Sequence, residues 1–386
     1  MSTQSVRRVW VRMELHKYKS LKIAIFVPYI EGLGGHLRVI ARLASYLKSK
    51  GHYIEIFTQR YNKDDTLGDF KNLKINILKP QSKSFAPFVF LLKKVKKFDV
   101  VVVGAFPATL GTIRNKPTFY ICYTPKRDFY NFKQFALQNS STLGKFNILL
   151  KNLMFKRIDF IAAQKATVLS PVSETVRRRS EKFYKRGGTG IIYCGIDFKD
   201  FKSGKYEDYM LIPSRFAPAK RVDMAVEAMG YVKNKKIKLY VVGDGPDRAK
   251  IERLAKRHKN VKLFGGISDS ELRKLYSNAL AVIYLPVSEE LGLVPIEAGA
   301  SEKAVIGANR GGLKETVING KTGFLISNPT PKKVAEKVDF LAKNRKTAIK
   351  MGKASKVYTK KFDWKNIMPE WERLIYLAYT QYNNHR

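Results

Sequence analysis

"LKIAIFVPYIEGLGGHLRVIARLASYLKSKGHYIEIFTQ", residues 21–59, contains a complete strand–turn–helix–strand unit. Its first ten residues form an apolar run typical of a buried strand, and the Gly-rich turn "EGLGGH" (31–36) follows directly. The next segment places Leu37, Ile40 and Leu47 on one helical face and ends at a Gly. An amphipathic helix between two buried strands is the repeating unit of a parallel sheet. The stretch therefore predicts an α/β fold.

The same alternation continues along the chain and restarts near its middle. Further runs typical of buried strands in the first half are 73–79, 98–104, 118–124 and 166–171. The polar, turn-rich segment 195–210 separates them from a second series of strands, at 209–214, 237–243, 261–265, 280–286 and 303–308. Helices are expected between these later strands, and two more, at 331–344 and 364–382, end the chain.

These elements predict two doubly wound domains that face each other across a cleft. We place the first domain at residues 21–203 and the second at 204–360. Residues 1–20 form a basic N-terminal extension, and residues 361–386 form a C-terminal helix that packs back on the first domain. Ligands of such sheets bind outside the carboxyl ends of the strands.

The charge of the chain is strongly positive. The 386 residues carry a formal net charge of +41, and residues 1–205 contain 39 basic and 13 acidic side chains. This field favours a polyanion, so nucleic acid, an anionic membrane and phosphorylated substrates all fit. No apolar run is long enough to span a bilayer, and residues 1–20 lack the apolar region of a secretory signal. Cys122 and Cys194 are the only cysteines, so we expect a cytoplasmic, reducing location.

Two Gly-rich turns and a pair of cations are candidates for phosphate binding. Gly34 and Gly35 lie between a strand and a helix, where backbone N–H groups can approach a phosphate. The pattern is not G-x-G-x-x-G, so a nicotinamide cofactor is not expected. Gly243 lies in a similar turn. Arg215 and Lys220 follow the first strand of the second domain and suit the oxygens of a diphosphate.

Two carboxylates mark a candidate sugar site. Glu289 follows strand 280–286, and Glu297 lies eight positions later in the next helix. Carboxylates accept hydrogen bonds from the vicinal hydroxyls of sugar and ribose rings. Between them, the backbone at Gly292 and Leu293 can bind a hexose or a phosphate. Because the two acids occur together in this turn, we favour a binding role over simple compensation of the helix dipole.

The stretch "EELGLVPIEAGASEKAVIGANRGGLKETVINGKTGFLI" (289–326) resembles the nucleotide-sugar domain of the large retaining glycosyltransferase family four. This family has the GT-B fold of two Rossmann-like domains. Its Glu–seven residues–Glu motif matches Glu289 and Glu297, and its Arg–four residues–Lys pair matches Arg215 and Lys220. "YCGIDFKDF" (193–201) is similar to the family's interdomain segment, and the first Gly turn also resembles the family's.

The resemblance implies a hexosyltransferase that uses a nucleotide-diphospho-sugar and retains the anomeric configuration. Glu297 would bind the donor ribose and Glu289 the donor sugar, while Arg215 and Lys220 would neutralise the leaving diphosphate. The donor site would also include Gly34, Gly35, Gly243, Ile267, Gly292 and Leu293. No Asp-x-Asp motif is present, so neither a metal nor another cofactor is expected. The nucleotide base stays open among GDP, UDP and ADP.

One segment departs from the family pattern. Members often carry a His in a segment like "CHTP", and here the sequence is "CYTP", with Tyr123 in that place. A Tyr can hydrogen-bond a sugar but is a poor base near neutral pH. His36, beside the first Gly turn, is a candidate substitute as the acceptor base.

Three segments mix large apolar residues with cations and suggest contact with a membrane surface. They are "FVFLLKKVKK" (88–97), "KFNILLKNLMFKR" (145–157) and "SETVRRRSEKFYKR" (173–186). Basic amphipathic helices dock on anionic membranes, so a lipid-linked acceptor at the inner membrane face is expected. Two alternatives remain: sugar transfer onto nucleic acid or protein, and a non-catalytic basic binding protein on the same scaffold.

Overall fold

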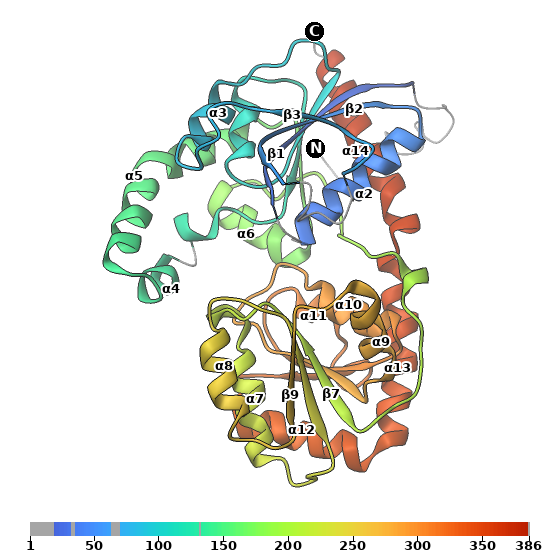
Figure 1. The fold of residues 1–386 in the computed structure, drawn as a ribbon. Helices are drawn as coiled ribbons and strands as arrows, with labels where there is room; N and C mark the ends of the chain where they lie inside the picture. Colours follow the sequence, from blue (N-terminus) through green and yellow to red (C-terminus); the bar gives the residue numbers. More distant parts are fainter. Residues whose placement is uncertain (1–18, 32–34, 63–69, 131–132, 385–386) are drawn as a thin grey trace.

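The computed structural model describes residues 19–31, 35–62, 70–130 and 133–384. Figure 1 shows two domains stacked one above the other, with the red C-terminal helix α14 alongside the upper one. Gly34 and nearly all of the expected N-terminal extension lie outside the described residues. No helix of the described residues has both the length and the apolar character needed to cross a membrane.

Helices alternate with strands in both domains. In the first domain the elements are β1 (Lys22–Ile30), α2 (Gly35–Ser49), β2 (Tyr53–Tyr61), β3 (Lys74–Ile77), α3 (Ala86–Leu92), β4 (Val100–Val103), β5 (Thr118–Cys122), α4 (Lys133–Gln138), α5 (Thr142–Lys165), β6 (Val168–Pro171) and α6 (Glu174–Tyr184). In the second they are β7 (Tyr209–Pro213), α7 (Val222–Tyr231), β8 (Lys238–Val242), α8 (Arg248–Ala255), β9 (Val261–Gly265), α9 (Asp269–Asn278), β10 (Ala281–Tyr284), α10 (Leu293–Ala300), β11 (Ala304–Ala308), α11 (Leu313–Thr316) and β12 (Gly323–Ile326). The chain ends with α12 (Pro331–Lys343), α13 (Arg345–Thr359) and α14 (Trp364–Asn383).

The two sheets have the same topology. Six parallel strands in the order β3-β2-β1-β4-β5-β6 form the first sheet. The second has the order β12-β11-β10-β7-β8-β9, which repeats that pattern in reverse. In each sheet the strand order reverses beside the first strand, between β1 and β4 and between β7 and β10. Ligands of open α/β sheets bind at such switch points, so two positions for a site follow from topology.

The C-terminal helix α14 belongs to the core of the first domain. Its Trp364, Ile367, Trp371 and Leu374 are buried with the strands of the first sheet. A bridge pairs Ile196 in the interdomain segment with Asp363 just before the helix. The chain therefore passes between the domains twice, and these crossings limit how far the domains can separate.

The structure corrects one expected element and adds two that the sequence did not predict. The segment 88–97 is not one helix, because α3 ends at Leu92 and the side chain of Asn115 holds the backbone of Lys93 and Val95. Asn115 accepts from the Val95 N–H at 2.9 Å and donates to the Lys93 carbonyl at 2.9 Å, which fixes an extended conformation. Strand β12 and helix α13 were not expected from the sequence pattern.

Candidate functional site

The switch point of the second sheet brings two of the predicted site residues together. Lys220 follows β7 and Glu289 follows β10, and these strands are neighbours. The Lys220 ammonium lies 2.7 Å from Glu289 Oε2 and 3.0 Å from the hydroxyl of Tyr284. That hydroxyl also donates to Glu289 Oε2 at 2.5 Å. Lys220 therefore forms one cluster at the end of the sheet with two residues that lie 64 and 69 positions later in the chain.

The electrostatics of this cluster keep Glu289 ionised. Burial acts to raise the pKa of the Glu289 carboxyl. The Lys220 charge, its hydrogen bond and that of Tyr284 outweigh burial, so the pKa lies below its usual value. Burial and the nearby Glu289 charge raise the pKa of Tyr284 well above its usual value, so Tyr284 stays a donor. The cluster thus offers a fixed carboxylate and a cation held close to it.

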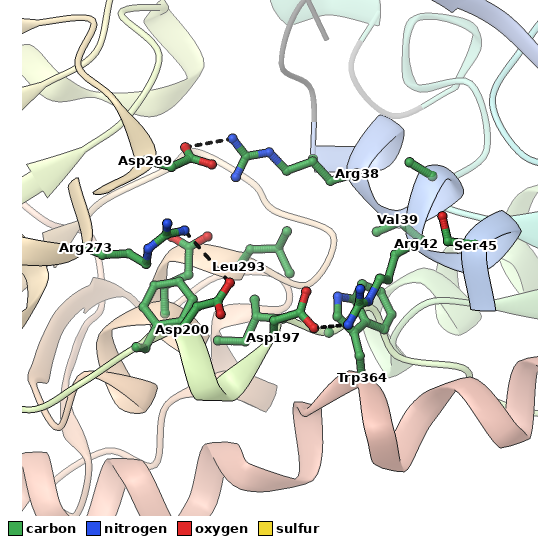
Figure 2. A pocket seen from close by; sticks show the side chains of 16 residues that line it. Arg38, Val39, Arg42, Ser45, Asp197, Asp200, Asp269, Arg273, Leu293 and Trp364 are labelled. Atoms are coloured by element: carbon green, nitrogen blue, oxygen red, sulfur yellow. Dashed lines mark hydrogen bonds and ion pairs between the residues drawn. The ribbon is translucent and has the colours of Figure 1, made fainter. Parts of the chain in front are cut away.

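Glu297 lines a pocket between the domains. The cavity has a volume of about 350 Å³ and receives residues from α2, the interdomain segment, α9, α10 and the start of α14. Figure 2 shows Arg38 of α2 reaching Asp269 of α9, a contact of 2.9 Å. Arg42 of α2 pairs with Asp197 of the interdomain segment. Charged side chains of both domains therefore surround a space that Glu297 can reach.

A buried phenol holds Glu297 in place. The hydroxyl of Tyr276 donates to Glu297 Oε2 at 2.6 Å. Burial raises the pKa of the Glu297 carboxyl, and the Tyr276 hydrogen bond opposes that effect only in part. Tyr276 donates to Oε2 only. The second carboxylate oxygen of Glu297, Oε1, is therefore available to accept a hydrogen bond from a ligand.

The N-termini of two helices meet between the domains. Gly35 is the first residue of α2, and Leu293 is the first residue of α10. A Cβ atom at Gly35 would lie 3.4 Å from Leu293 Cδ1, so a larger side chain would fill the space between the helix ends. Gly292 precedes α10 with a φ of 89°, a conformation that favours glycine. Two positive helix ends facing one space favour an anionic ligand there.

Tyr123 and His36, the two candidates for acceptor chemistry, lie next to each other. Their rings meet edge to face with centroids 6.3 Å apart. The Tyr123 hydroxyl is buried and has no hydrogen-bond partner among the described residues. The surrounding protein lowers the pKa of His36 because it removes water from the charged form. An imidazole with a lowered pKa and an unused hydroxyl therefore lie together in the first domain.

Comparison with known proteins assigns both halves of the chain. Residues 33–200 match the family described as Glycosyltransferase Family 4, and residues 196–358 match Glycosyl transferases group 1. The chain belongs to glycosyltransferase family 4. The glycosyltransferase is 25% identical over 351 residues to an uncharacterized glycosyltransferase of Methanocaldococcus jannaschii, a match that covers 90% of this chain and 94% of the relative. It is 24% identical over 399 residues to an alpha-1,3/1,6-mannosyltransferase of Dictyostelium discoideum, with coverage of 86% and 92%.

Solved structures identify the fold as GT-B. The crystal structure of HepE from Anabaena, in complex with UDP and glucose, matches with a TM-score of 0.73 and 15% identity. The match covers 92% of the glycosyltransferase and 98% of HepE. The predicted fold and family are therefore confirmed.

Other predicted donor-site residues are placed around the same edge of the second domain. Arg215 lies on the loop that carries Lys220, but its side chain is exposed and forms no hydrogen bond or ion pair within the described part of the chain. Gly243 follows β8, and its N–H donates to the carbonyl of Gly265. Ile267 is half-buried between β9 and α9. Lys220 thus contacts Glu289 directly, while among the described residues neither Arg215 nor Glu297 forms a hydrogen bond or ion pair with Lys220 or Glu289.

Sequence reasoning missed a polar bridge between the domains at Glu290. Arg179 of α6 donates to Glu290 Oε1 at 3.1 Å and to the Ser288 hydroxyl at 2.7 Å. Arg127 also approaches Glu290 Oε1, at 3.4 Å. Burial and the neighbouring Glu289 raise the pKa of Glu290, and the two guanidinium groups act against that rise. Arg179 lies in the segment 173–186, so part of this segment contacts the second domain.

A second missed contact involves Glu315 of the second domain and the start of α6. The Glu315 carboxylate accepts from the N–H groups of Glu174 and Thr175, at 2.8 and 2.9 Å, and from the Thr175 hydroxyl at 2.8 Å. It therefore satisfies free N–H groups at the positive end of a helix in the other domain. The only sign of this contact in the sequence was Glu315 itself, which lies 140 positions from Thr175.

We expect Glu315→Ala to weaken the contact between the domains. Loss of these charge-assisted bonds should lower stability by about 1–3 kcal/mol. Differential scanning calorimetry measures the effect, and Glu336→Ala, which removes an exposed acid from α12, is the matched control. Equal melting temperatures for the two variants would contradict a stabilising role for the Glu315 contact.

Proposed function

We propose that the glycosyltransferase is a retaining, metal-independent hexosyltransferase that uses a nucleotide-diphospho-sugar. The observation that carries the proposal is the cluster of Lys220, Glu289 and Tyr284 at the switch point of the second sheet. The relatives support the sugar class, because one is named a mannosyltransferase and HepE was crystallised with UDP and glucose. Retention is proposed from the match of Glu289 and Glu297 to the motif of the retaining family.

The reaction breaks the bond between the anomeric carbon and the β-phosphate oxygen of the donor. The departing nucleoside diphosphate takes the electron pair, and its negative charge grows as the bond lengthens. Lys220 and the N-termini of α2 and α10 stabilise that charge, and Arg215 joins them from the same loop; the contact of Lys220 with Glu289 and the approach of the two helix ends support these roles. Because such groups are already ordered, little reorganisation is needed during the reaction.

Retention requires the acceptor to enter from the face that the diphosphate leaves. An acceptor hydroxyl on that face lies beside the departing phosphate oxygens, which can take its proton as the new bond forms. Glu289 binds hydroxyls of the transferred sugar, and Glu297 binds the donor ribose. The unused Tyr123 hydroxyl supplies a further hydrogen bond from the first domain, where the acceptor enters.

A lipid-linked acceptor at the cytoplasmic face of a membrane fits the first domain best. Residues 1–205 carry 39 basic and 13 acidic side chains, so an anionic surface is attracted to this half of the chain. The acceptor sugar would then reach the space between the domains while its lipid stays in the bilayer.

A panel of nucleotide sugars tests the donor assignment. One member of the panel is expected to raise the melting temperature, because a ligand at 100 times its Kd stabilises the folded state by about 2.7 kcal/mol. NMR of the product then gives the anomeric configuration, which is expected to be that of the donor. Transfer is expected to be unchanged in EDTA. A panel without any stabilising member, an inverted product or loss of activity in EDTA each contradicts a part of the proposal.

A further inference from the structure

Two neighbouring helices of the first domain expose large apolar side chains to solvent. On α5, Leu143, Phe146 and Leu153 are 84%, 66% and 83% exposed. Phe85, just before α3, and Leu92, the last residue of α3, are 55% and 60% exposed. The described residues include fifteen large exposed apolar side chains. Seven lie on α5: Leu143, Phe146, Leu149, Leu150, Leu153, Met154 and Ile161. Four lie on or beside α3: Ile77, Phe85, Phe88 and Leu92. These eleven residues are called the α3–α5 face.

Helices α3 and α5 touch through one pair of rings. The ring of Phe88, which belongs to the α3–α5 face, packs edge to face on the buried ring of Phe155 on α5, with centroids 5.5 Å apart. A hollow of about 590 Å³ beside α3 is lined by Ile77, Phe85, Leu92 and other residues of this segment. Figure 1 shows α4 and α5 projecting from the side of the first domain, with α4 at the level where the two domains meet. An exposed apolar area of this kind marks an interaction surface.

The charged residues within the two segments that form the α3–α5 face are all positive. Residues 83–98 contain five lysines and no acidic residue, and residues 142–158 contain Lys145, Lys151, Lys156 and Arg157 without an acid. The next acid on α5, Asp159, is buried and accepts from the hydroxyls of Tyr184 and Tyr130. The cations of α5 are exposed. Apolar side chains interspersed with cations fit the interface of an anionic bilayer.

A second copy of the chain is a poorer partner for this face. Twofold pairing would place the same surface on both subunits, so lysines of one copy would face lysines of the other. Like charges brought together in this way oppose association. Anionic phospholipids offer the opposite charge and an apolar interior for the leucines and phenylalanines.

We propose that the α3–α5 face docks the first domain on a bilayer that contains anionic phospholipid. This inference rests on the proposed function in one respect, since it places the junction of the domains near a lipid-borne acceptor. The leucine and phenylalanine side chains enter the boundary between head groups and acyl chains, while Lys145, Lys151 and Arg157 contact the phosphates. Of the three segments suggested by the sequence, 145–157 and the first part of 88–97 form this face.

Flotation of the full chain with vesicles tests the docking. Binding is expected to vesicles of phosphatidylglycerol and phosphatidylcholine, and to fall in high salt or with pure phosphatidylcholine. The variant Leu143→Ser/Phe146→Ser/Leu153→Ser should bind at least tenfold more weakly. The matched control, Tyr231→Ser/Val357→Ser, removes apolar side chains that are 59% and 79% exposed on the second domain, and should bind like the wild type. Lys145→Gln/Lys151→Gln/Arg157→Gln should bind more weakly and show a smaller dependence on salt, because the five lysines of residues 83–98 remain.

Three results would overturn the docking surface. They are no binding of the wild type to phosphatidylglycerol vesicles, equal binding of the α5 serine variant, and a dimer in light scattering that this variant converts to a monomer. Melting temperatures should be unchanged in all variants because the altered side chains are exposed. Stabilisation by the nucleotide sugar is measured separately on the same variants. If vesicles bind and no nucleotide sugar does, the proposed function fails while the docking surface stands.

Discussion

Replacing Lys220 by Ala is expected to lower kcat for sugar transfer by a factor of about 10²–10³, because one preorganised donor to developing charge contributes about 2.7–4 kcal/mol. Contacts within the protein fix the position of Lys220, with Glu289 at 2.7 Å and Tyr284 at 3.0 Å. The diphosphate gains charge only as the glycosidic bond breaks. The loss should therefore appear in kcat and kcat/KM together, with a smaller change in the Kd of the nucleotide sugar.

The control for Lys220 is a lysine with a similar partner outside the site. Lys250 of α8 forms an ion pair with Asp223 on the surface of the same domain, so Lys250→Ala removes a paired cation without touching the switch point. Its kcat should match that of the wild type. Lys220→Arg, which keeps the charge but changes its shape, should recover part of the activity. If Lys220→Ala keeps kcat within about threefold of the wild type, the proposal that Lys220 stabilises the charge of the leaving diphosphate is wrong.

The sequence predicted the fold well because strands of a doubly wound sheet are buried on both faces. Runs such as 98–104 and 280–286 are continuous apolar stretches, and the helices between them repeat at 3.6 residues. Helix α13 lacks that signal because it packs through small residues. Its buried side includes Ala348, Gly352 and Ser355, and a Cβ at Gly299 of α10 would lie 2.8 Å from Ser355 Oγ. Close helix packing through small residues leaves no regular spacing of large apolar residues in the sequence from which the helix could be predicted.

The site was predictable where its residues share one sheet. Lys220 and Glu289 follow neighbouring strands, so topology brings them together once the strand order is known. Tyr284 and Tyr276 were not singled out from the sequence, since a buried Tyr differs from a Phe only by a hydroxyl that needs a partner. The contacts of Glu290 and Glu315 join two domains, and their positions depend on how the domains dock. Periodicity within one segment carries no information about that arrangement.

Replacing Glu297 by Ala is expected to raise the Kd of the nucleotide sugar by a factor of about 10–100, because hydrogen bonds to a charged group contribute about 1.5–3 kcal/mol. Tyr276 donates to one carboxylate oxygen at 2.6 Å, and the proposed ribose hydroxyls would donate to the other. The ribose is remote from the bond that breaks, so kcat at saturating donor should change little. Calorimetric titration with the donor found in the panel measures the Kd, and steady-state kinetics measures kcat.

A 2′-deoxyribose analogue of that donor separates ribose binding from a general effect on the pocket. The wild type should bind the analogue about tenfold more weakly than the natural donor, whereas Glu297→Ala should bind the two alike because the acceptor oxygen is already absent. Tyr276→Phe keeps the carboxylate but frees it to rotate, so its Kd should lie between those of the wild type and Glu297→Ala. A variant Glu297→Ala that keeps the preference for the natural donor, or that loses kcat at an unchanged Kd, would place Glu297 at the reacting sugar and not at the ribose.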